Sequence, residues 1–96
     1  MAPDRAQAWV DKAFSLRRAS GGSIEKAKAV LREAAKLFPT EWAVQYNLAC
    51  YSAQLGQLDA AKEHLHKSYE SGDAKQIKLM ALDEEDLKPL WDGEVK

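Results

Sequence analysis

The chain has 96 residues, of which 30% are charged and 46% hydrophobic, and its net charge is −1. This length suits one small domain. The near balance of charge gives no electrostatic reason to expect binding to nucleic acid or to an anionic membrane. The charge is unevenly distributed, because residues 1–40 hold eight Lys or Arg against four Asp or Glu, whereas residues 81–96 hold six acids against two lysines.

The single cysteine, Cys50, rules out an internal disulfide and fits a reducing compartment. The first residues lack the apolar segment of a secretory signal. No apolar run approaches the roughly 18–20 residues that cross a bilayer. We therefore expect a soluble, cytoplasmic protein that does not enter a membrane.

Good helix formers fill the stretches between the three prolines, and no segment alternates apolar and polar residues as a strand would. A first helix is predicted over about residues 4–19, ending at Ser20-Gly21-Gly22 because glycine adopts the left-handed conformation easily. The apolar side of this helix is formed by Trp9, Val10, Ala13, Phe14 and Leu16/Arg17.

Ser23 is a suitable N-cap for a second helix, which Pro39 ends. Thr40 offers a cap to a third helix, and Glu41 falls in its first turn, where the helix dipole favours an acid. Gly56 ends this third helix. Each boundary is thus predicted from a residue with a specific backbone preference.

A fourth helix is predicted over about residues 58–71, ending at Gly72, and a fifth over about 74–82. The acidic run at 83–86 is typical of the cap and first turn of a short sixth helix, which carries Leu87, Leu90 and Trp91. The chain is therefore predicted to be all-α, with about five helices and a short C-terminal capping helix.

The glycines that end the first and third helices, Gly22 and Gly56, are 34 residues apart, and residues 8–41 align with 42–75 at this spacing. Most of the six identities fall where two antiparallel helices must touch, and Phe14 aligns with Leu48. The identical pairs are Val10/Val44, Ala19/Ala53, Gly22/Gly56, Ala27/Ala61, Lys28/Lys62 and Leu31/Leu65.

These positions resemble the tetratricopeptide repeat (TPR) family. The second unit carries the stronger match, in Tyr46-Asn47-Leu48-Ala49, Leu55-Gly56, Asp59-Ala60-Ala61 and Leu65. The first unit shares Phe14, Gly22, Ala27, Leu31, Ala34 and Pro39. The chain departs from the family pattern where Gln45 replaces an aromatic residue, Ser15 and Ala49 replace a glycine, and Asp73 replaces a proline.

The resemblance implies a single TPR-like domain over residues 1–96, in which helix pairs stack into a right-handed superhelix, an α-solenoid. The first repeat is expected at about 8–41, the second at about 42–75, and the cap at about 76–92. Two repeats are fewer than the roughly three that such arrays need. The C-terminal segment is therefore expected to pack on the second repeat as a half-repeat and to cover its open apolar side.

In the family, the first helix of each pair lines a concave groove, and a mostly apolar groove suits an extended peptide or a helix. The residues that the resemblance places there are Trp9, Lys12, Ala13, Leu16 and Ala19 from the first helix, Ala43, Tyr46, Asn47, Cys50, Ala53 and Gln54 from the third, and Ile77, Met80 and Ala81 from the fifth.

The chaperone-binding subclass of the family holds the C-terminal carboxylate of a peptide in a basic clamp. Lys12 and Asn47 agree with the clamp pattern, whereas Leu16, Ile77 and Ala81 depart from it. The sequence therefore argues against capture of a chaperone tail.

Several groove residues have a second interpretation. Asn47 could bind a peptide backbone or bridge neighbouring helices, because an amide both donates and accepts. Tyr46 could stack on a ligand or pack between repeats, and Lys12 could pair with an acid on a partner or stay solvated. Cys50 is best interpreted as a small buried hydrophobic residue rather than a nucleophile.

His64 and His66 are two residues apart, which separates them by about 200° around a helix. Metal-binding pairs on a helix use a spacing of three or four, so no metal site is expected. No phosphate loop, dinucleotide fingerprint, calcium loop or Ser–His–Asp arrangement is present in the sequence.

These observations predict a non-enzymatic protein–protein interaction module, an adaptor or scaffold without a cofactor, that binds a protein or peptide in its groove. The alternative is a structural role, in which the apolar groove or the C-terminal half-repeat forms a homo-oligomer. The sequence does not identify the partner.

Overall fold

The computed structural model describes the backbone of residues 5–18 and 23–95 and the side chains of residues 6–17 and 23–91. In these ranges the fold consists of helices and the turns between them, with no strand. The elements are α1 (Arg5–Arg18), α2 (Ile24–Leu37), α3 (Trp42–Gln54), α4 (Leu58–Ser71), α5 (Ala74–Asp83), the 3-10 helix η1 (Glu85–Leu87) and α6 (Lys88–Val95).

The prediction of an all-α chain with five helices and a short C-terminal helix is therefore confirmed. The residues that were predicted to end the first helix, Ser20-Gly21-Gly22, lie outside the described residues, as does Ala19 from the predicted groove.

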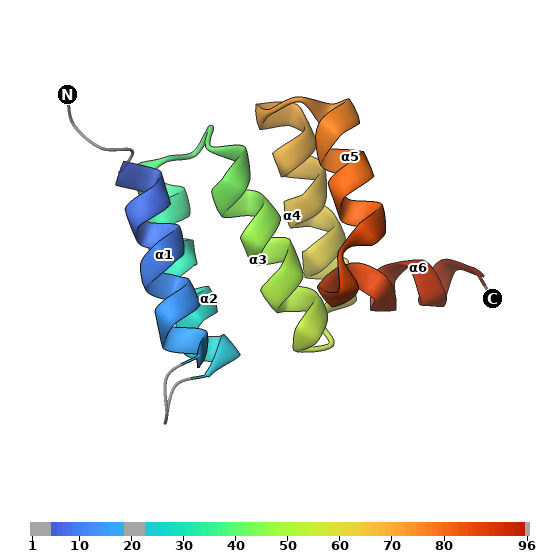
Figure 1. Ribbon diagram of the computed structural model, residues 1–96, viewed down its shortest axis with the longest axis horizontal. Helices are drawn as coiled ribbons and strands as arrows, with labels where there is room; N and C mark the ends of the chain where they lie inside the picture. The colour runs from blue at the N-terminus through green and yellow to red at the C-terminus, as the bar shows by residue number, and fades with distance from the viewer. Residues whose placement is uncertain (1–4, 19–22, 96) are drawn as a thin grey trace.

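The helices form two layers, with α1, α3 and α5 in front and α2 and α4 behind them (Figure 1). Helix α1 packs against α2, and α3 packs against α4, as antiparallel neighbours joined by short connections. Helix α5 lies beside α4, and α6 turns across the lower end of α5 (Figure 1). None of the described helices is long and apolar enough to cross a membrane.

Two apolar cores lie on either side of α3, which contributes residues to both. The first core joins α1, α2 and α3, and it contains Ala6, Ala13, Ala27, Leu31, Ala34, Val44, Leu48 and Tyr51. The second core joins α3, α4, α5 and the C-terminal segment, and it contains Tyr46, Ala49, Cys50, Ala53, Ala61, Leu65, Ile77, Ala81, Leu87 and Leu90. Because α3 is covered on several sides, nine of its thirteen residues are buried.

The boundaries of α2 and α3 follow two different mechanisms. The Ser23 side chain accepts a hydrogen bond from the Lys26 amide at 3.0 Å, so the predicted N-cap of α2 is confirmed. The predicted cap at Thr40 is wrong, because α3 begins after Glu41, whose side chain makes no capping hydrogen bond. The packing of Trp42 and Val44, rather than a cap, therefore fixes the start of α3.

Two glycines shape the turns for different reasons. Gly56 adopts a φ of 78° after α3, a left-handed conformation that side chains rarely tolerate. Gly72 has an extended backbone, and its role is close approach: a Cβ there would lie 2.7 Å from Cγ of Trp42. The absence of a side chain at Gly72 lets the Trp42 ring pack against the connection between α4 and α5.

The C-terminal segment buries its apolar residues in the second core. Leu87 of η1 and Leu90 of α6 are almost completely buried. Trp91 is half-buried, and its indole nitrogen donates a hydrogen bond to the Ala81 carbonyl at 3.2 Å. Burying a large apolar side chain contributes about 1.5–3 kcal/mol, so the segment from η1 to α6, here called the cap, stabilises the second core.

Helix α1 turns a different face to the core from the one that the repeat predicts. Ala13 is fully buried, whereas Phe14, which the repeat aligns with the buried Leu48, is 44% exposed. Successive residues lie about 100° apart around a helix, so α1 is rotated by about one residue relative to α3. The placement of Phe14 on the apolar side of α1 and of Ala13 in an open groove is therefore wrong.

Candidate binding groove

Four of the groove residues predicted on the third helix form one stripe of α3. Ala43, Asn47, Cys50 and Gln54 follow one another at spacings of three and four, so they share one side of the helix. Ala43 and Asn47 are half-exposed, whereas Cys50 is buried. The stripe is therefore buried at Cys50, whereas Gln54 at its end is half-buried, like Ala43 and Asn47.

The half of the stripe that contains Cys50 and Gln54 meets the cap at Asp86 of η1. The Gln54 side-chain amide donates a hydrogen bond to Asp86, and the Arg17 guanidinium lies 3.5 Å from the same carboxylate. Arg17 also lies over the Tyr51 ring, 5.7 Å from its centroid. These polar contacts join α1, α3 and η1 at one point and hold the cap against the end of the groove.

Cys50 is part of the second core beneath this contact. Burial raises the pKa of the Cys50 thiol, the carboxylates of Glu84 and Asp86 raise it further, and Arg17 acts in the opposite direction. A thiol must lose its proton to act as a nucleophile. The site therefore suits packing, in agreement with the sequence interpretation of this residue.

Tyr46 and Ile77, which were also predicted to line the groove, lie in the second core and are 6% and 2% exposed. Tyr46 packs edge-on against Trp42, with 6.0 Å between ring centroids. Burial also raises the pKa of the Tyr46 hydroxyl. Of the two interpretations of Tyr46, the structure favours packing. Ala53 and Ala81, from the wider predicted groove, are buried in the same core.

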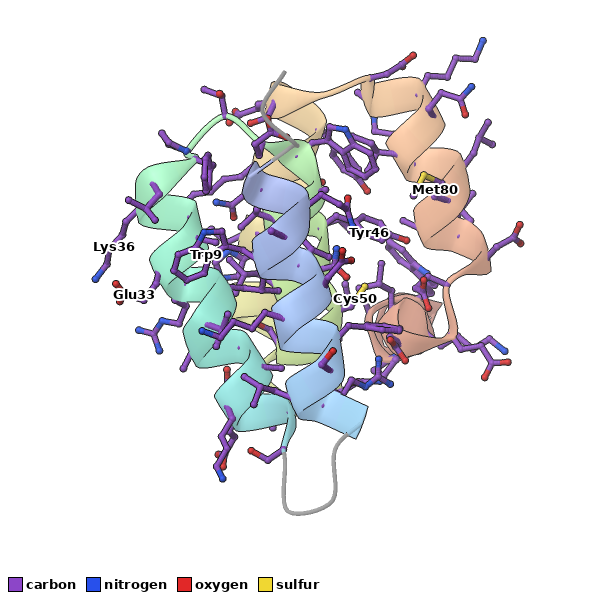
Figure 2. All side chains as sticks on the ribbon, turned by 60° about the vertical axis from the view of Figure 1, so that its left-hand side comes forward. Trp9, Glu33, Lys36, Tyr46, Cys50 and Met80 are labelled. Atoms are coloured by element: carbon purple, nitrogen blue, oxygen red, sulfur yellow. The ribbon has the colours of Figure 1, made fainter. Side chains whose placement is uncertain are left out.

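Three of the five groove residues predicted on the first helix, Trp9, Lys12 and Leu16, lie on another side of α1. Trp9 packs on the first core, on the α2 side of α1, whereas Tyr46, Cys50 and Met80 lie on its opposite side (Figure 2). Lys12 lies over the Trp9 ring, 5.8 Å from its centroid. Leu16 is within about 20° of Trp9 by helix geometry. The structure therefore does not bring this α1 set together with the α3 stripe.

A different side of α1 carries Val10, Phe14 and Arg17, which lie within about 60° of one another around the helix. Val10 packs on the first core, and Arg17 contacts Asp86 and the Tyr51 ring. Sequence reasoning missed Phe14 as a surface residue, because the repeat placed it opposite Leu48. A signal was available in the sequence, because Ala6 and Ala13 are small residues spaced seven apart, which places them on one side of the helix. A stripe of small residues predicts close packing of α1, which leaves Phe14 at its edge.

Two predicted residues remain at the surface of the groove. Met80 on α5 is 42% exposed and lies on the same side of α1 as Tyr46 and Cys50 (Figure 2). The Asn47 amide donates to the Ala43 carbonyl at 2.8 Å, so this bond stays within α3 and does not join two helices. An amide has a second N–H and a carbonyl oxygen, and the Asn47 side chain is only partly buried.

The histidines give no metal site within the described residues, where no three His, Cys, Asp or Glu side chains gather around a common point. His64 Nδ1 is 2.8 Å from Oε1 of the buried Gln45, which joins α4 to α3. His66 is exposed and packs beside Tyr69. Gln45 stands where the sequence resemblance predicts an aromatic residue, and its contact with His64 accounts for a polar side chain at this buried position.

Comparison with protein-family models, with curated proteins and with solved structures found no match to this chain.

Proposed function

We propose that the chain is a non-enzymatic TPR-like interaction module that binds a protein or peptide partner in the groove between α1, α3 and α5. Two helix pairs, at about 8–41 and 42–75, would act as the repeats of a short α-solenoid, with 76–92 as its half-repeat and cap. The 34-residue spacing of the sequence and the stacking of two helix pairs support this proposal. One buried cysteine suits a cytoplasmic location.

The observation that carries the proposal is that two exposed apolar side chains, on α1 and α5, accompany a polar side chain on α3. Phe14 of α1 and Met80 of α5 are 44% and 42% exposed, and their two helices lie on opposite sides of α3 (Figure 1). Asn47 lies on α3, between these two helices, with unused hydrogen-bonding capacity. Apolar anchors around a few polar groups are typical of peptide-binding grooves.

The partner would enter the groove at Asn47, away from the end of the stripe where Asp86 lies. Its apolar side chains would contact Phe14 and Met80, and its backbone would bond to Asn47. Trp9 and Lys12 lie too far around α1 to contact such a partner. Lys12 is the basic residue that agrees with the chaperone-type clamp, so the groove lacks that residue. The chemistry of the groove therefore favours an apolar segment over a free carboxylate.

Affinity purification from the source cell, followed by mass spectrometry, tests this proposal when three forms are compared. A Phe14→Ser/Met80→Ser variant should lose the specific partners of the wild-type protein. A Leu37→Ser variant is the matched control, because Leu37 is 61% exposed and lies on α2, away from the groove. Equal recovery of every partner by the double variant and by the control would count against the groove.

A structural role in self-association is the second candidate, and two exposed leucines favour it. Leu79 and Leu82 of α5 are 56% and 64% exposed, and their spacing of three places them on one side of the helix. This side is the open edge of the half-repeat, where a further helix would pack in a longer solenoid. Light scattering over a concentration series tests the role: Leu79→Ser/Leu82→Ser should abolish a dimer, and a wild-type monomer throughout would contradict it.

A further inference from the structure

A line of basic residues runs along the outer side of α2. Lys28, Arg32 and Lys36 are each four residues apart, so they lie on one face of the helix at intervals of about 6 Å. Lys67 of α4 lines the same pocket as Lys36, together with Gln45 of α3. We refer to Lys28, Arg32, Lys36 and Lys67 as the basic face.

Lys28 of α2 is linked to the start of α4, and the charges of both helices act on one another. The Lys28 ammonium donates a hydrogen bond to the side chain of Gln57, directly before α4. Burial and the positive charge of Arg32 lower the pKa of Lys28. For His64 of α4, burial lowers the pKa most, Lys67, Lys28 and Arg32 lower it further, and only Glu63 acts in the opposite direction. Like charges therefore crowd this side of the molecule.

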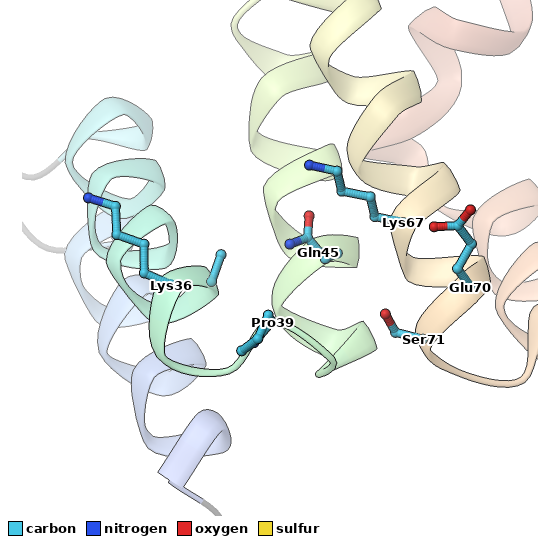
Figure 3. A pocket seen from close by; sticks show the side chains of 7 residues that line it. Lys36, Pro39, Gln45, Lys67, Glu70 and Ser71 are labelled. Carbon is cyan, nitrogen blue, oxygen red and sulfur yellow. The ribbon is translucent and has the colours of Figure 1, made fainter.

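The two helices leave a pocket at the C-terminal end of the basic face. Its volume is about 440 Å³, and the residues that line it include Lys36, Pro39, Gln45, Lys67, Glu70 and Ser71. Figure 3 shows Gln45 and Lys67 directed into the opening between α2 and α4. The floor is the buried Gln45 amide, held by His64. Polar groups at the floor and basic groups at the edges fit a ligand with negative charge.

Acidic residues of the chain neutralise only part of this charge. Glu33 forms an ion pair with Lys36 at 3.2 Å, with both side chains largely exposed, and Glu70 lies at the edge of the pocket. Within the described residues, Arg32 and Lys67 form no ion pair. Exposed pairs contribute little to stability, so an incoming carboxylate competes easily with Glu33 for Lys36.

We propose that the basic face and its pocket bind an extended acidic segment of a partner protein, with carboxylates on alternate residues. In an extended chain, alternate side chains point to one side and lie about 6.7 Å apart, which is close to the spacing along α2. Three successive carboxylates would meet Lys28, Arg32 and Lys36, and Lys67 would close over the segment from α4. This surface lies behind the groove, so the inference is independent of the proposed function.

The test is fluorescence anisotropy at low salt with a labelled synthetic peptide in which glutamate alternates with serine. The wild-type protein should bind this peptide, and its affinity should fall as sodium chloride is added. Arg32→Gln/Lys67→Gln should weaken binding by at least about tenfold. Lys75→Gln/Lys88→Gln removes the same charge from exposed positions outside the basic face, and it should change binding less than about twofold.

Two further peptides test the geometry. A peptide with glutamine in place of glutamate, and one with the same glutamates in a single block, should both bind more weakly. Equal binding of all three peptides, or equal loss in the two double variants, would overturn the proposal. Equal thermal midpoints by circular dichroism establish that both variants are folded.

A second copy of the chain is the competing occupant, because its residues 83–86 are acidic. Sedimentation velocity at low salt separates the two cases. If the wild-type protein self-associates, Arg32→Gln/Lys67→Gln abolishes the association, and the alternating peptide does not bind, the assignment to a partner protein is wrong. A monomer that binds the peptide supports it.

Discussion

Asp86 in η1 accepts a hydrogen bond from the side chain of Gln54 on α3, a residue 32 positions earlier in the chain. Arg17 of α1 approaches the same carboxylate. One acidic side chain thereby connects the first helix, the central helix and the cap. The contact lies at the end of the α3 stripe, next to the buried Cys50, whereas Ala43 and Asn47 at the start of the stripe are half-buried.

Replacing Asp86 with alanine should destabilise the protein by about 1 kcal/mol, because it removes a charge-assisted hydrogen bond and a partly exposed ion pair. Chemical denaturation monitored by circular dichroism measures this loss. Glu85→Ala is the matched control, since Glu85 is a neighbouring exposed acid of η1, and it should have almost no effect. Equal losses of unfolding free energy in the two variants would show that the negative charge of the cap, and not the specific contacts of Asp86, stabilises the protein.

Leu87→Ala should lower the free energy of unfolding by about 2–5 kcal/mol, because it opens a cavity in the second core, where Leu87 is fully buried. Leu82→Ala removes the same atoms from a residue that is 64% exposed, and its effect should stay within about 0.5 kcal/mol. A small effect of Leu87→Ala would mean that the cap does not stabilise the second core.

Cys50 should report on closure of the cap. In the native protein the thiol should react slowly with a disulfide reagent at pH 8, because it is buried and its pKa is raised. Asp86→Ala and Leu87→Ala should both accelerate the reaction, and Leu82→Ala should not. Rapid reaction of the wild-type thiol would contradict the closed arrangement.

Stability should depend on pH through His64, whose pKa lies below the usual 6.5 because burial and the neighbouring lysines disfavour its charged form. The unfolded chain then binds more protons than the folded protein at pH values between the lowered pKa and 6.5. The free energy of unfolding should therefore rise with pH through this window. Above pH 6.5 the contribution of His64 should be fully present, and it should be lost on acidification through the window.

Denaturation curves at pH 5 and pH 7.5 measure this dependence, and His64→Asn should reduce the difference between them. Asparagine keeps a donor for Gln45 without a titrating ring. His66→Asn is the control, because His66 is exposed on the same helix. An unchanged pH dependence in His64→Asn would show that other groups cause it.

The helices could be predicted because their ends carry residues with strong local preferences. Ser23, Pro39 and Gly56 act within one turn of their own position, so their effect is visible in the sequence. The cap could also be predicted from the sequence, because apolar residues at 87, 90 and 91 follow an acidic turn. These features depend on residues that are close together in the chain.

The groove was harder to predict from the sequence, because it depends on the rotation of α1 about its axis and on contacts between residues that are distant in the chain. Ala13 and Phe14 are adjacent and both apolar, so the pattern alone does not decide which one faces the core, and packing favours the smaller residue. The contact of Gln54 with Asp86 pairs two polar residues far apart in sequence. No periodicity in the sequence marks such a pair. The burial of Cys50 was therefore predicted only from the usual behaviour of a free cysteine, and not from this contact.

Site-specific photo-crosslinking most directly tests the central claim that partners bind in the groove between α1, α3 and α5. A benzophenone side chain replaces Phe14 in one variant and Leu37 in another, both at exposed apolar positions. After irradiation in the source cell, the partner should be crosslinked from position 14 and not from position 37. Crosslinking of the same partner from position 37 alone, or equally from both positions, would contradict the account.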